Sequence, residues 1–333
     1  MSAGHIEMGL TVSAQPRPCP LCAGNAHDVV GTHDRNGEPL RTVMCSTCGH
    51  VFTNPAPTAE ELSAYYGTKY RAEYKGVLTP KRKHILRAGY RALERLERLA
   101  PFAAPPSVVL DIGAGGGEFA YLLASRGYNV SGIEPNAGYA GYARDTYGLD
   151  IQATTLEQAR VEPGAFDVIT LHHVFEHLLD VRAGLSLFHG WLKPGGVLVI
   201  EVPNVMSWFH APRRRFHAAH LHSFNAHGLE DVLMAEGFSI ESTLITPGPM
   251  HVNIVARKQN AAAPSAFRNA APEVMAHFKR HTALTHFISG MALSRLWGNA
   301  LRPWREARAL ARLGEPQTGR EILDRLYQPQ PAA

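Results

Sequence analysis

The sequence predicts an α/β protein built on a doubly wound, mostly parallel sheet, with an addition at each end. Apolar runs typical of buried strands recur through residues 105–258, and segments with helical spacing separate them. Strands that alternate with helices in this way pair in parallel and carry helices on both faces of the sheet. Four cysteines near the N-terminus predict a small metal-binding module, and a basic stretch after residue 258 predicts a helical extension.

The first core strand is expected at 108–112, and a glycine-rich loop follows it at once. Asp111 lies near the end of the apolar run, and Gly113, Gly115 and Gly117 precede an amphipathic segment. Glycines allow positive φ angles and let a ligand come within contact distance of the backbone. A strand that passes through such a loop into a helix is the layout of a nucleotide-type cofactor site.

Three downstream segments agree with this interpretation. The strand expected over 128–134 ends in Glu134, close to the ~20-residue offset from Gly113 at which a carboxylate meets the hydroxyls of a bound ribose. A strand over 165–172 runs into a helix rich in polar groups. A helix that stops at Pro-Gly-Gly is followed by a strand over 197–203. Ligands of such sheets bind beyond the carboxyl ends of the strands.

The ordered motifs DIGAGGGEF, GIEPN, FDVITLHHVFEHL and LKPGGVLVIEVPN resemble those of class I S-adenosylmethionine-dependent methyltransferases. The resemblance spans roughly residues 105–257. It implies a methyltransferase enzyme with a Rossmann-like sheet of seven strands and S-adenosylmethionine as cofactor. It also implies which residues contact each part of that cofactor. The methionine end is expected to lie against Asp111, Gly113, Ala114, Gly115 and Gly117, and the ribose hydroxyls against Glu134. The adenine or sulfonium side is expected to lie near Pro135, Asn136, Thr155 and His172.

A nicotinamide dinucleotide is the competing cofactor, and its fingerprint is G-x-G-x-x-G at a helix start. Glu118 stands where the third glycine should be, and a carboxylate there would repel a pyrophosphate. Asp111 suits a ligand with an ammonium and a sulfonium better than a diphosphate. An NAD-dependent oxidoreductase therefore stays the weaker alternative.

The cysteine module has the pattern Cys-x2-Cys-x22-Cys-x2-Cys and uses every cysteine of the chain: Cys19, Cys22, Cys45 and Cys48. Two CxxC turns can close a tetrahedral S4 site, which suits a structural Zn(II). Gly49 supplies the left-handed corner that such a turn needs. Iron in a rubredoxin-like site and a redox CxxC pair are the alternatives.

An N-terminal CxxC…CxxC ribbon that ends in CGHVFTNPAP, followed by a Tyr-rich helical link and the core, resembles bacterial methyltransferases of sugar, polysaccharide or secondary-metabolite pathways. Sugar C-methyltransferases with this layout usually carry a further α/β domain, which 258–333 does not resemble. The expected domains are a zinc ribbon, a helical linker that forms a lid on the cofactor site, the methyltransferase core, and a basic helical extension. Their respective bounds are 1–57, 58–104, 105–258 and 259–333.

The linker is expected to begin with a helix capped by Thr58, because Glu61 three residues later completes a capping box. A second helix is expected over 80–100, where apolar residues recur at helical spacing. The resemblance places such helices over the cofactor pocket. The tyrosines of the linker are therefore expected to pack there or to reach the site: Tyr65, Tyr66 and Tyr70.

The segment 205–228 interrupts the core with histidines, arginines and aromatic residues. By the resemblance it helps to build the substrate site, and its composition suits a sugar or an anionic acceptor. Histidine is the usual base near neutral pH. His220 is the first candidate base, because His220-Leu221-His222-Ser223-Phe224 is similar to an HL-x-x-F setting in sugar-acting enzymes. His222, His173 and His177 are the other candidates.

The formal net charge of +4 is unevenly distributed, because residues 257–333 hold 12 basic and 5 acidic residues. The stretch 272–327 is expected to be helical, basic and amphipathic. It can pack on the core, form a homodimer or lie on an anionic membrane surface. No nucleic-acid-binding motif accompanies the charge. No secretory signal or apolar run of membrane-spanning length is visible, so we expect a cytoplasmic protein.

Together these observations predict an S-adenosylmethionine-dependent methyltransferase that acts on a small-molecule or sugar acceptor, with oxygen as the expected target atom. The alternative from another class is a catalytically silent zinc-ribbon scaffold that keeps the cofactor fold as a binding shell.

Overall fold

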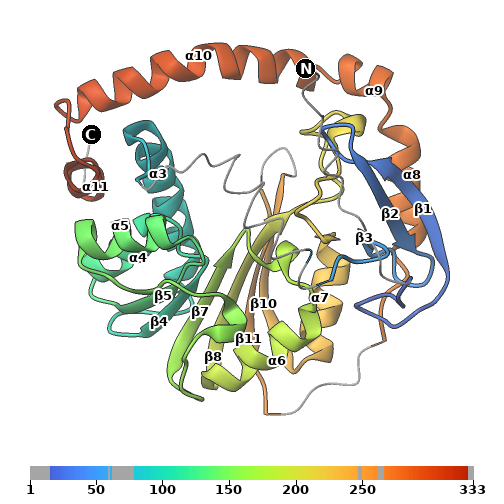
Figure 1. The fold of residues 1–333 in the computed structure, drawn as a ribbon, viewed down its shortest axis with the longest axis horizontal. Helices are drawn as coiled ribbons and strands as arrows, with labels where there is room; N and C mark the ends of the chain where they lie inside the picture. The colour runs from blue at the N-terminus through green and yellow to red at the C-terminus, as the bar shows by residue number, and fades with distance from the viewer. Residues whose placement is uncertain (1–15, 59–60, 62–78, 247–249, 261–265, 329–333) are drawn as a thin grey trace, which may run out of the picture.

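The structure is a computed structural model that describes residues 16–58, 61, 79–246, 250–260 and 266–328. The described residues form a seven-stranded sheet, a four-stranded sheet and the helices around them (Figure 1). The tyrosines of the expected lid lie outside these residues: Tyr65, Tyr66 and Tyr70.

The seven-stranded sheet confirms the predicted fold class. Its order is β10-β11-β8-β7-β4-β5-β6. Strands β8, β7, β4, β5 and β6 are parallel to one another. Strand β11 is antiparallel to β8, and β10 is antiparallel to β11. The bounds are β4 Val108–Ile112, β5 Asn129–Ile133, β6 Asp150–Gln152, β7 Phe166–His172, β8 Leu192–Pro203, β10 Phe238–Ile245 and β11 His251–Lys258.

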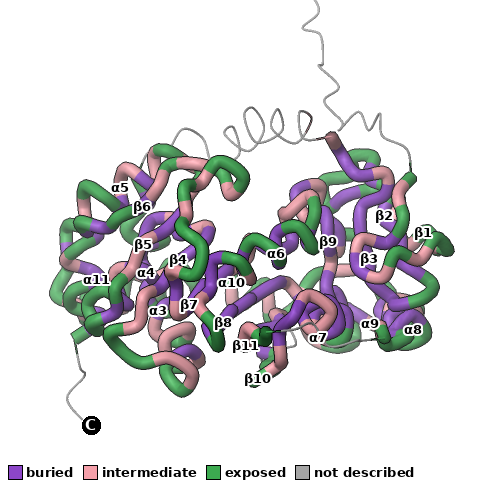
Figure 2. Tube along the Cα trace, turned by 90° about the horizontal axis from the view of Figure 1, so that it is seen from below, coloured by how far each residue is buried: buried purple, intermediate pink, exposed green. Residues whose placement is uncertain are grey.

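Helices cover both faces of this sheet because its strands alternate their apolar side chains between two cores. On β4, Val109 belongs to the core under α3, α4, α5 and α11, whereas Leu110 belongs to the core under α6 and α7. Figure 2 shows the strands of this sheet as largely buried between those layers. The bounds are α3 Arg82–Leu99, α4 Glu118–Ser125, α5 Ala137–Tyr147, α6 Val181–Trp191, α7 Ala226–Ala235 and α11 Gly319–Tyr327.

Two local predictions of the sequence need correction. The segment after β7 forms only a short 3-10 turn, η3 (Phe175–His177), and α6 starts later, capped by the Asp180 side chain. The Pro-Gly-Gly sequence at 194–196 does not end a helix either, because α6 already stops at Trp191 and β8 begins at Leu192. Gly195 has a φ of 72°, and the register between β7 and β8 shifts in this region, so the strand accommodates an irregularity.

The capping box predicted for the linker is present. The Thr58 amide donates to Glu61 Oε2 over 2.8 Å, and the Glu61 amide donates to Thr58 Oγ1 over 3.2 Å. The helix expected over 80–100 is α3, whose buried face includes Ile85 and Leu99. The C-terminal helix α11 packs against α3, where Leu326 Cδ2 lies only 2.6 Å from the position that a Cβ on Gly89 would occupy. The helical extension thus completes the helix layer of the core.

The four-stranded sheet has the order β1-β2-β3-β9 and joins two distant parts of the chain. The first three strands belong to the cysteine module, whereas β9 comes from the segment 205–228. Helix α8 covers this sheet, and Val274 packs in one core with Met44 and Phe216. The ribbon expected at 1–57 therefore shares its sheet and its core with later residues. The bounds are β1 His27–His33, β2 Pro39–Cys45, β3 Val51–Thr53, β9 His222–Ser223 and α8 Ala271–Arg280.

Helices α9 (Ala283–Ile288) and α10 (Met291–Arg312) follow α8, and α10 runs from the ribbon side of the molecule to α11 (Figure 1). No helix within the described residues is long and apolar enough to span a membrane.

Candidate functional site

The glycine loop after β4 is held against the neighbouring strand by backbone hydrogen bonds. The amides of Gly113 and Ala114 donate to the Ile133 carbonyl over 2.8 and 3.1 Å. Gly113, Gly115 and Gly117 have φ angles of 72°, 57° and 86°. A Cβ on Gly113 would lie 2.3 Å from Val174 Cγ2. The loop can therefore follow this path only with glycine at that position.

Glu134, at the end of β5, faces this loop. The Gly115 amide donates to its Oε2 over 2.8 Å, and the Asn136 amide donates to its Oε1 over 2.7 Å. Burial raises the pKa of the Glu134 carboxyl, although these two amides favour the charged form. Each carboxylate oxygen has a second lone pair available after one amide has bound. The carboxyl is thus fixed in orientation and can still accept hydrogen bonds from a vicinal diol.

Asp111 and His172 lie side by side at the ends of the neighbouring strands β4 and β7. Thr170 Oγ1 donates to Asp111 Oδ1 over 2.7 Å, and His172 Nδ1 lies 3.9 Å from the same oxygen. Burial, reinforced by the positive charge of Arg95, lowers the pKa of His172 to about 4. The imidazole is therefore neutral at pH 7, and the carboxylate supplies the negative charge of this corner.

The remaining cofactor candidates lie along the same edge of the sheet. Asn136 caps α5 with its side chain, which accepts from the amides of Gly138 and Tyr139, and the exposed Pro135 precedes it. Thr155 starts the short turn η2 (Leu156–Gln158), which follows the edge strand β6.

His173 lies in the left-handed region with a φ of 60°. Its ring stands between two carboxylates: Nδ1 is 3.5 Å from Glu176 Oε1, and Nε2 is 3.4 Å from Glu201 Oε1. Burial disfavours the charged ring, but Glu176 and Glu201 outweigh it and raise the pKa of His173. A non-glycine residue in this conformation is strained and marks a site that the surrounding structure enforces.

Two arginines hold Glu201 from the opposite side. Arg95 Nη2 donates to Glu201 Oε1 over 2.8 Å, and Arg98 Nη1 donates to Oε2 over 2.9 Å. Burial would raise the pKa of Glu201, but His173 and Arg95 lower it well below its usual range. Sequence reasoning missed this group. Its signal was an acid inside the apolar run VLVIEVP, because a charge within a buried strand needs a partner.

A second cluster joins the loop after β7 to the segment 205–228. His177 Nδ1 lies 2.8 Å from the Ala219 carbonyl, and its ring centre is 4.9 Å from that of His220. One ligand atom each of Glu176, His177 and His220 lies within 4.8 Å of the others. Burial, and then the charge of His177, lowers the pKa of His220 to about 3. The insertion thus comes into contact with the loop after β7.

His222 lies elsewhere. It is 1% exposed, and its Nδ1 is 3.1 Å from His50 Nε2 in the cysteine module. Burial lowers its pKa well below 6.5. The structure therefore gives this ring a packing role between the ribbon and the core, and it separates His222 from the cluster around His173 and His220.

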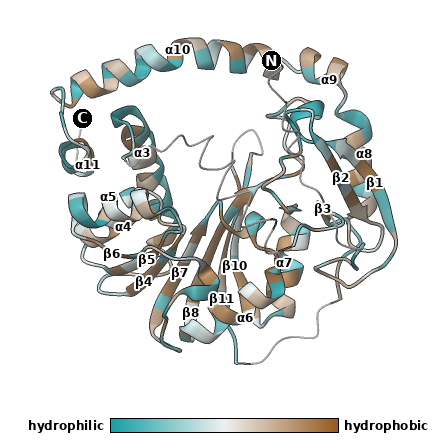
Figure 3. Cartoon of the chain, in the orientation of Figure 1, coloured by the Kyte–Doolittle hydropathy of each residue, from teal (hydrophilic) through white to brown (hydrophobic). Residues whose placement is uncertain are grey.

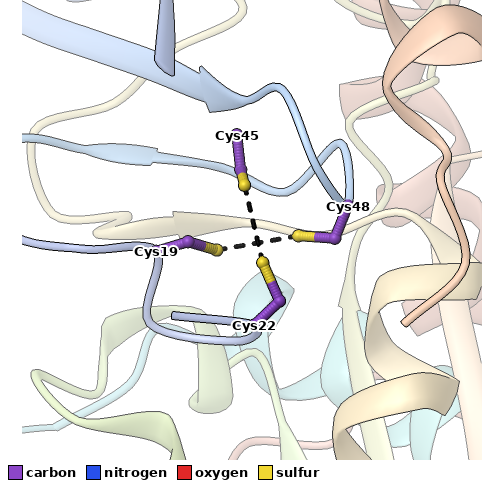
Figure 4. Close-up of side chains that lie close together, drawn as sticks. All are labelled: Cys19, Cys22, Cys45 and Cys48. Carbon is purple, nitrogen blue, oxygen red and sulfur yellow. Dashed lines mark hydrogen bonds between the residues drawn. The ribbon is translucent and has the colours of Figure 1, made fainter. Parts of the chain in front are cut away.

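The four cysteines converge on one point (Figure 4). Cys19 Sγ is 3.6 Å from Cys48 Sγ, and Cys22 Sγ is 3.5 Å from Cys45 Sγ. Sulfurs that lie ~2.3 Å from one tetrahedral zinc ion are separated by ~3.8 Å, so the donor set and the spacing fit a closed S4 site. Gly49 has the predicted left-handed conformation, with a φ of 75°, and Ala23 takes the same role in the first turn, with a φ of 59°.

Comparison with known proteins agrees with this geometry. Residues 83–243 match the family model described as Methyltransferase domain. A ubiquinone biosynthesis O-methyltransferase of Pseudomonas aeruginosa is 36% identical over 102 residues, which cover 29% of this chain and 44% of that protein. A probable S-adenosylmethionine-dependent methyltransferase of Mycolicibacterium smegmatis is 29% identical over 137 residues, or 41% of this chain and 53% of that protein. The chain thus spans about half the length of the curated relatives it matches.

Among solved structures, the 1,6-didemethyltoxoflavin-N1-methyltransferase of Burkholderia thailandensis, solved with S-adenosylhomocysteine, has a TM-score of 0.44 at 18% identity. The match covers 63% of this chain and 96% of that one. The motifs, the sheet and the family match agree with one another: residues 83–243, just under half of the chain, match a methyltransferase domain.

Proposed function

We propose that the chain is an enzyme that transfers a methyl group from S-adenosylmethionine to an oxygen of a small-molecule acceptor. The single observation that carries this proposal is the orientation of Glu134, whose two oxygens are fixed by the amides of Gly115 and Asn136 beside the glycine loop. A carboxylate fixed in this way is suited to grip the ribose hydroxyls of a nucleoside cofactor.

The other end of the same edge suits a cationic ligand. The Asp111 carboxylate lies beside a neutral His172 and would attract the ammonium or sulfonium of the cofactor. A dinucleotide fits less well. Glu118 occupies the first turn of α4, where a dinucleotide-binding loop has its third glycine and the diphosphate would have to sit.

When bound, S-adenosylmethionine supplies an electrophilic methyl group, and its transfer to a hydroxyl leaves a neutral thioether and one proton to be removed. We assign that proton to His173. Glu176 and Glu201 raise its pKa, which makes this ring a stronger base than a free imidazole. His220, the first candidate from the sequence, is a weaker base, because burial lowers its pKa to about 3. We propose that His220 and His177 position the acceptor instead.

The acceptor pocket we propose is a hollow of about 260 Å³ that adjoins His173. Its lining includes Arg91, Glu201 and His251, and the His251 ring centre is 4.7 Å from that of His173. Arginines at its wall favour an acceptor that carries an anionic or strongly polar group, such as a sugar derivative. The name of the Pseudomonas aeruginosa relative, an O-methyltransferase, supports oxygen as the target atom.

We propose that the cysteine site holds a structural Zn(II) ion. Four thiolate ligands leave no open position for chemistry. Such a site also requires reduced thiols, which supports a reducing compartment such as the cytoplasm.

The test is transfer of a radiolabelled methyl group from S-adenosylmethionine to a panel of hydroxylated acceptors, including phenols and sugars with and without acidic groups. We expect at least one acceptor to be labelled by the wild type and labelling to be lost in His173→Gln. If cofactor binds but no acceptor is labelled in any member of a broad panel, the catalytically silent scaffold becomes the better account.

A further inference from the structure

The outward face of α9 and α10 carries most of the exposed large apolar side chains among the described residues. Eight of the thirteen belong to these two helices, each 40–72% exposed. Soluble proteins rarely expose a contiguous apolar patch of this kind unless something binds it. We call this group the apolar stripe: Leu284, Phe287, Ile288, Leu293, Leu296, Trp297, Leu301 and Trp304.

The stripe faces away from the protein. Leu293, Trp297, Leu301 and Trp304 repeat at helical spacing, and none of the 22 residues of α10 is buried. The opposite side of the helix makes the contacts with the core. There Arg295 Nη1 donates to the Phe209 carbonyl over 3.0 Å, and Glu306 Oε1 lies 3.1 Å from Arg87 Nε. Figure 3 shows apolar and polar patches alternating along α10 at the top of the molecule.

The charge beside the stripe is positive. Arg305, Arg308 and Arg312 are exposed on α10. The one acid of this helix is Glu306, which faces inward toward Arg87 and is 12% exposed in its side chain. The Arg308 guanidinium lies 5.2 Å from the Trp304 ring centre. Tryptophan prefers the boundary between water and lipid, and arginine extends its charge from such a boundary to phosphate groups.

The apolar stripe and the arginines beside it together favour one kind of binding partner over the others. In a symmetric pair of α10 helices, the same arginines of two copies would approach one another with no acid on that face to neutralise them. A nucleic acid would satisfy the arginines but would leave the apolar stripe in water. An anionic lipid surface satisfies both groups at once, because its acyl boundary accepts apolar side chains and its headgroups carry negative charge.

We propose that α9 and α10 form an in-plane docking element for an anionic lipid surface. The apolar stripe enters the boundary between headgroups and acyl chains, and Arg305, Arg308 and Arg312 bind the lipid phosphates. This inference goes beyond methyl transfer and does not depend on it. Since α10 contacts both α3 and the segment 205–228, docking would hold the cofactor edge of the sheet close to the lipid surface.

The test is co-sedimentation of the full chain with two kinds of vesicle, phosphatidylcholine alone and phosphatidylcholine mixed with phosphatidylglycerol. We expect binding to the mixed vesicles only. The double substitution Trp297→Ser and Trp304→Ser should weaken binding by about tenfold or more, because it removes the two largest apolar groups of the stripe. Leu244→Ser, at a side chain that is 43% exposed on β10, is the matched control and should bind like the wild type.

A triple substitution of Arg305, Arg308 and Arg312 to Gln should also weaken binding and reduce its dependence on salt. The proposal is overturned if the wild type ignores the mixed vesicles or if the tryptophan variant binds them as well as the wild type. It is also overturned if light scattering finds a dimer that the tryptophan variant dissociates. Calorimetry with S-adenosylhomocysteine on the same variants should give unchanged affinity, which separates a failure of docking from a failure of the proposed function.

Discussion

The ring nitrogens His50 Nε2 and His222 Nδ1 lie 3.1 Å apart, and this contact joins residues that are 172 positions apart in the chain. His50 follows the second cysteine turn, and His222 starts β9, which pairs with β3. Burial lowers the pKa of His50 to about 3, so the pair is neutral, with one ring donating and the other accepting. The cysteine module is thereby coupled to the segment 205–228.

Loss of the metal should therefore disturb the segment 205–228 as well as the ribbon. We expect Cys45→Ser to release about one zinc ion per chain and to lower the melting temperature, because a structural zinc site contributes folding energy directly. The affinity for S-adenosylhomocysteine should change much less. Elemental analysis, thermal melting and calorimetry check the three expectations.

Thr47→Ser is the matched control for this experiment, because Thr47 lies in the same turn and is exposed. It should keep both the zinc and the melting temperature. Full stability of Cys45→Ser without zinc would show that the four cysteines do not hold a structural metal.

The His50–His222 contact makes a prediction of its own. His222→Leu should destabilise the fold by about 1–3 kcal/mol, since it leaves the buried His50 nitrogen without a partner. His50→Leu together with His222→Leu should cost less than the sum of the two single changes. Urea unfolding of the four proteins gives the coupling. Additive effects would mean that the two rings make no energetically significant hydrogen bond.

The buried neutral histidines should make the fold sensitive to acid. In the folded state the pKa values of His50 and His220 are lowered to about 3, below the usual value of 6.5. Between these values the unfolded chain binds more protons, so stability is fully present above pH 6.5 and falls as the pH decreases. The loss is up to about 1.4 kcal/mol per pH unit for each such histidine.

Urea unfolding at several pH values between 7.5 and 5 measures this loss. A variant with His50→Phe and His222→Phe should lose less stability over the same range, because two of the neutral rings are gone. Equal slopes for the wild type and this variant would contradict the assignment of these rings as neutral in the fold.

The pKa of His173 is shifted in the opposite direction, upward, and should set the pH dependence of catalysis. Because Glu176 and Glu201 raise the pKa of His173, the ring must lose its proton at a pH above 6.5 before it can act as a base. We expect kcat/KM to rise with pH through this region, and His173→Gln to lower kcat by about 100-fold or more and remove the rise. His220→Asn should raise KM more than it lowers kcat. A rise in rate that survives in His173→Gln would assign the base to another group.

Local features of the site could be predicted from the sequence. The glycine loop, Glu134 and the two cysteine turns depend on residues that are close in the chain, so spacing and backbone conformation were sufficient. The Thr58–Glu61 capping box was predictable for the same reason.

Contacts across the fold were not predictable in this way. The partners of Glu201 are Arg95 and Arg98, which lie more than 100 residues earlier on α3. The environment of His222 depends on β9, a strand of two residues that has no periodicity to detect. The partners of Glu201 and the burial of His222 both depend on the packing of elements that are distant in the chain. The proposed base is His173 and not His220 for the same reason, because the pKa of each ring depends on its surroundings in the fold.

Calorimetric titration of the full chain with S-adenosylhomocysteine tests the central claim most directly. The wild type should release heat and bind one molecule per chain. Glu134→Ala should bind about 10 to 100 times more weakly because it loses the acceptors for the ribose hydroxyls, and the exposed control Glu157→Ala should match the wild type. No heat from the wild type, or equal affinity of Glu134→Ala and wild type, would contradict the account.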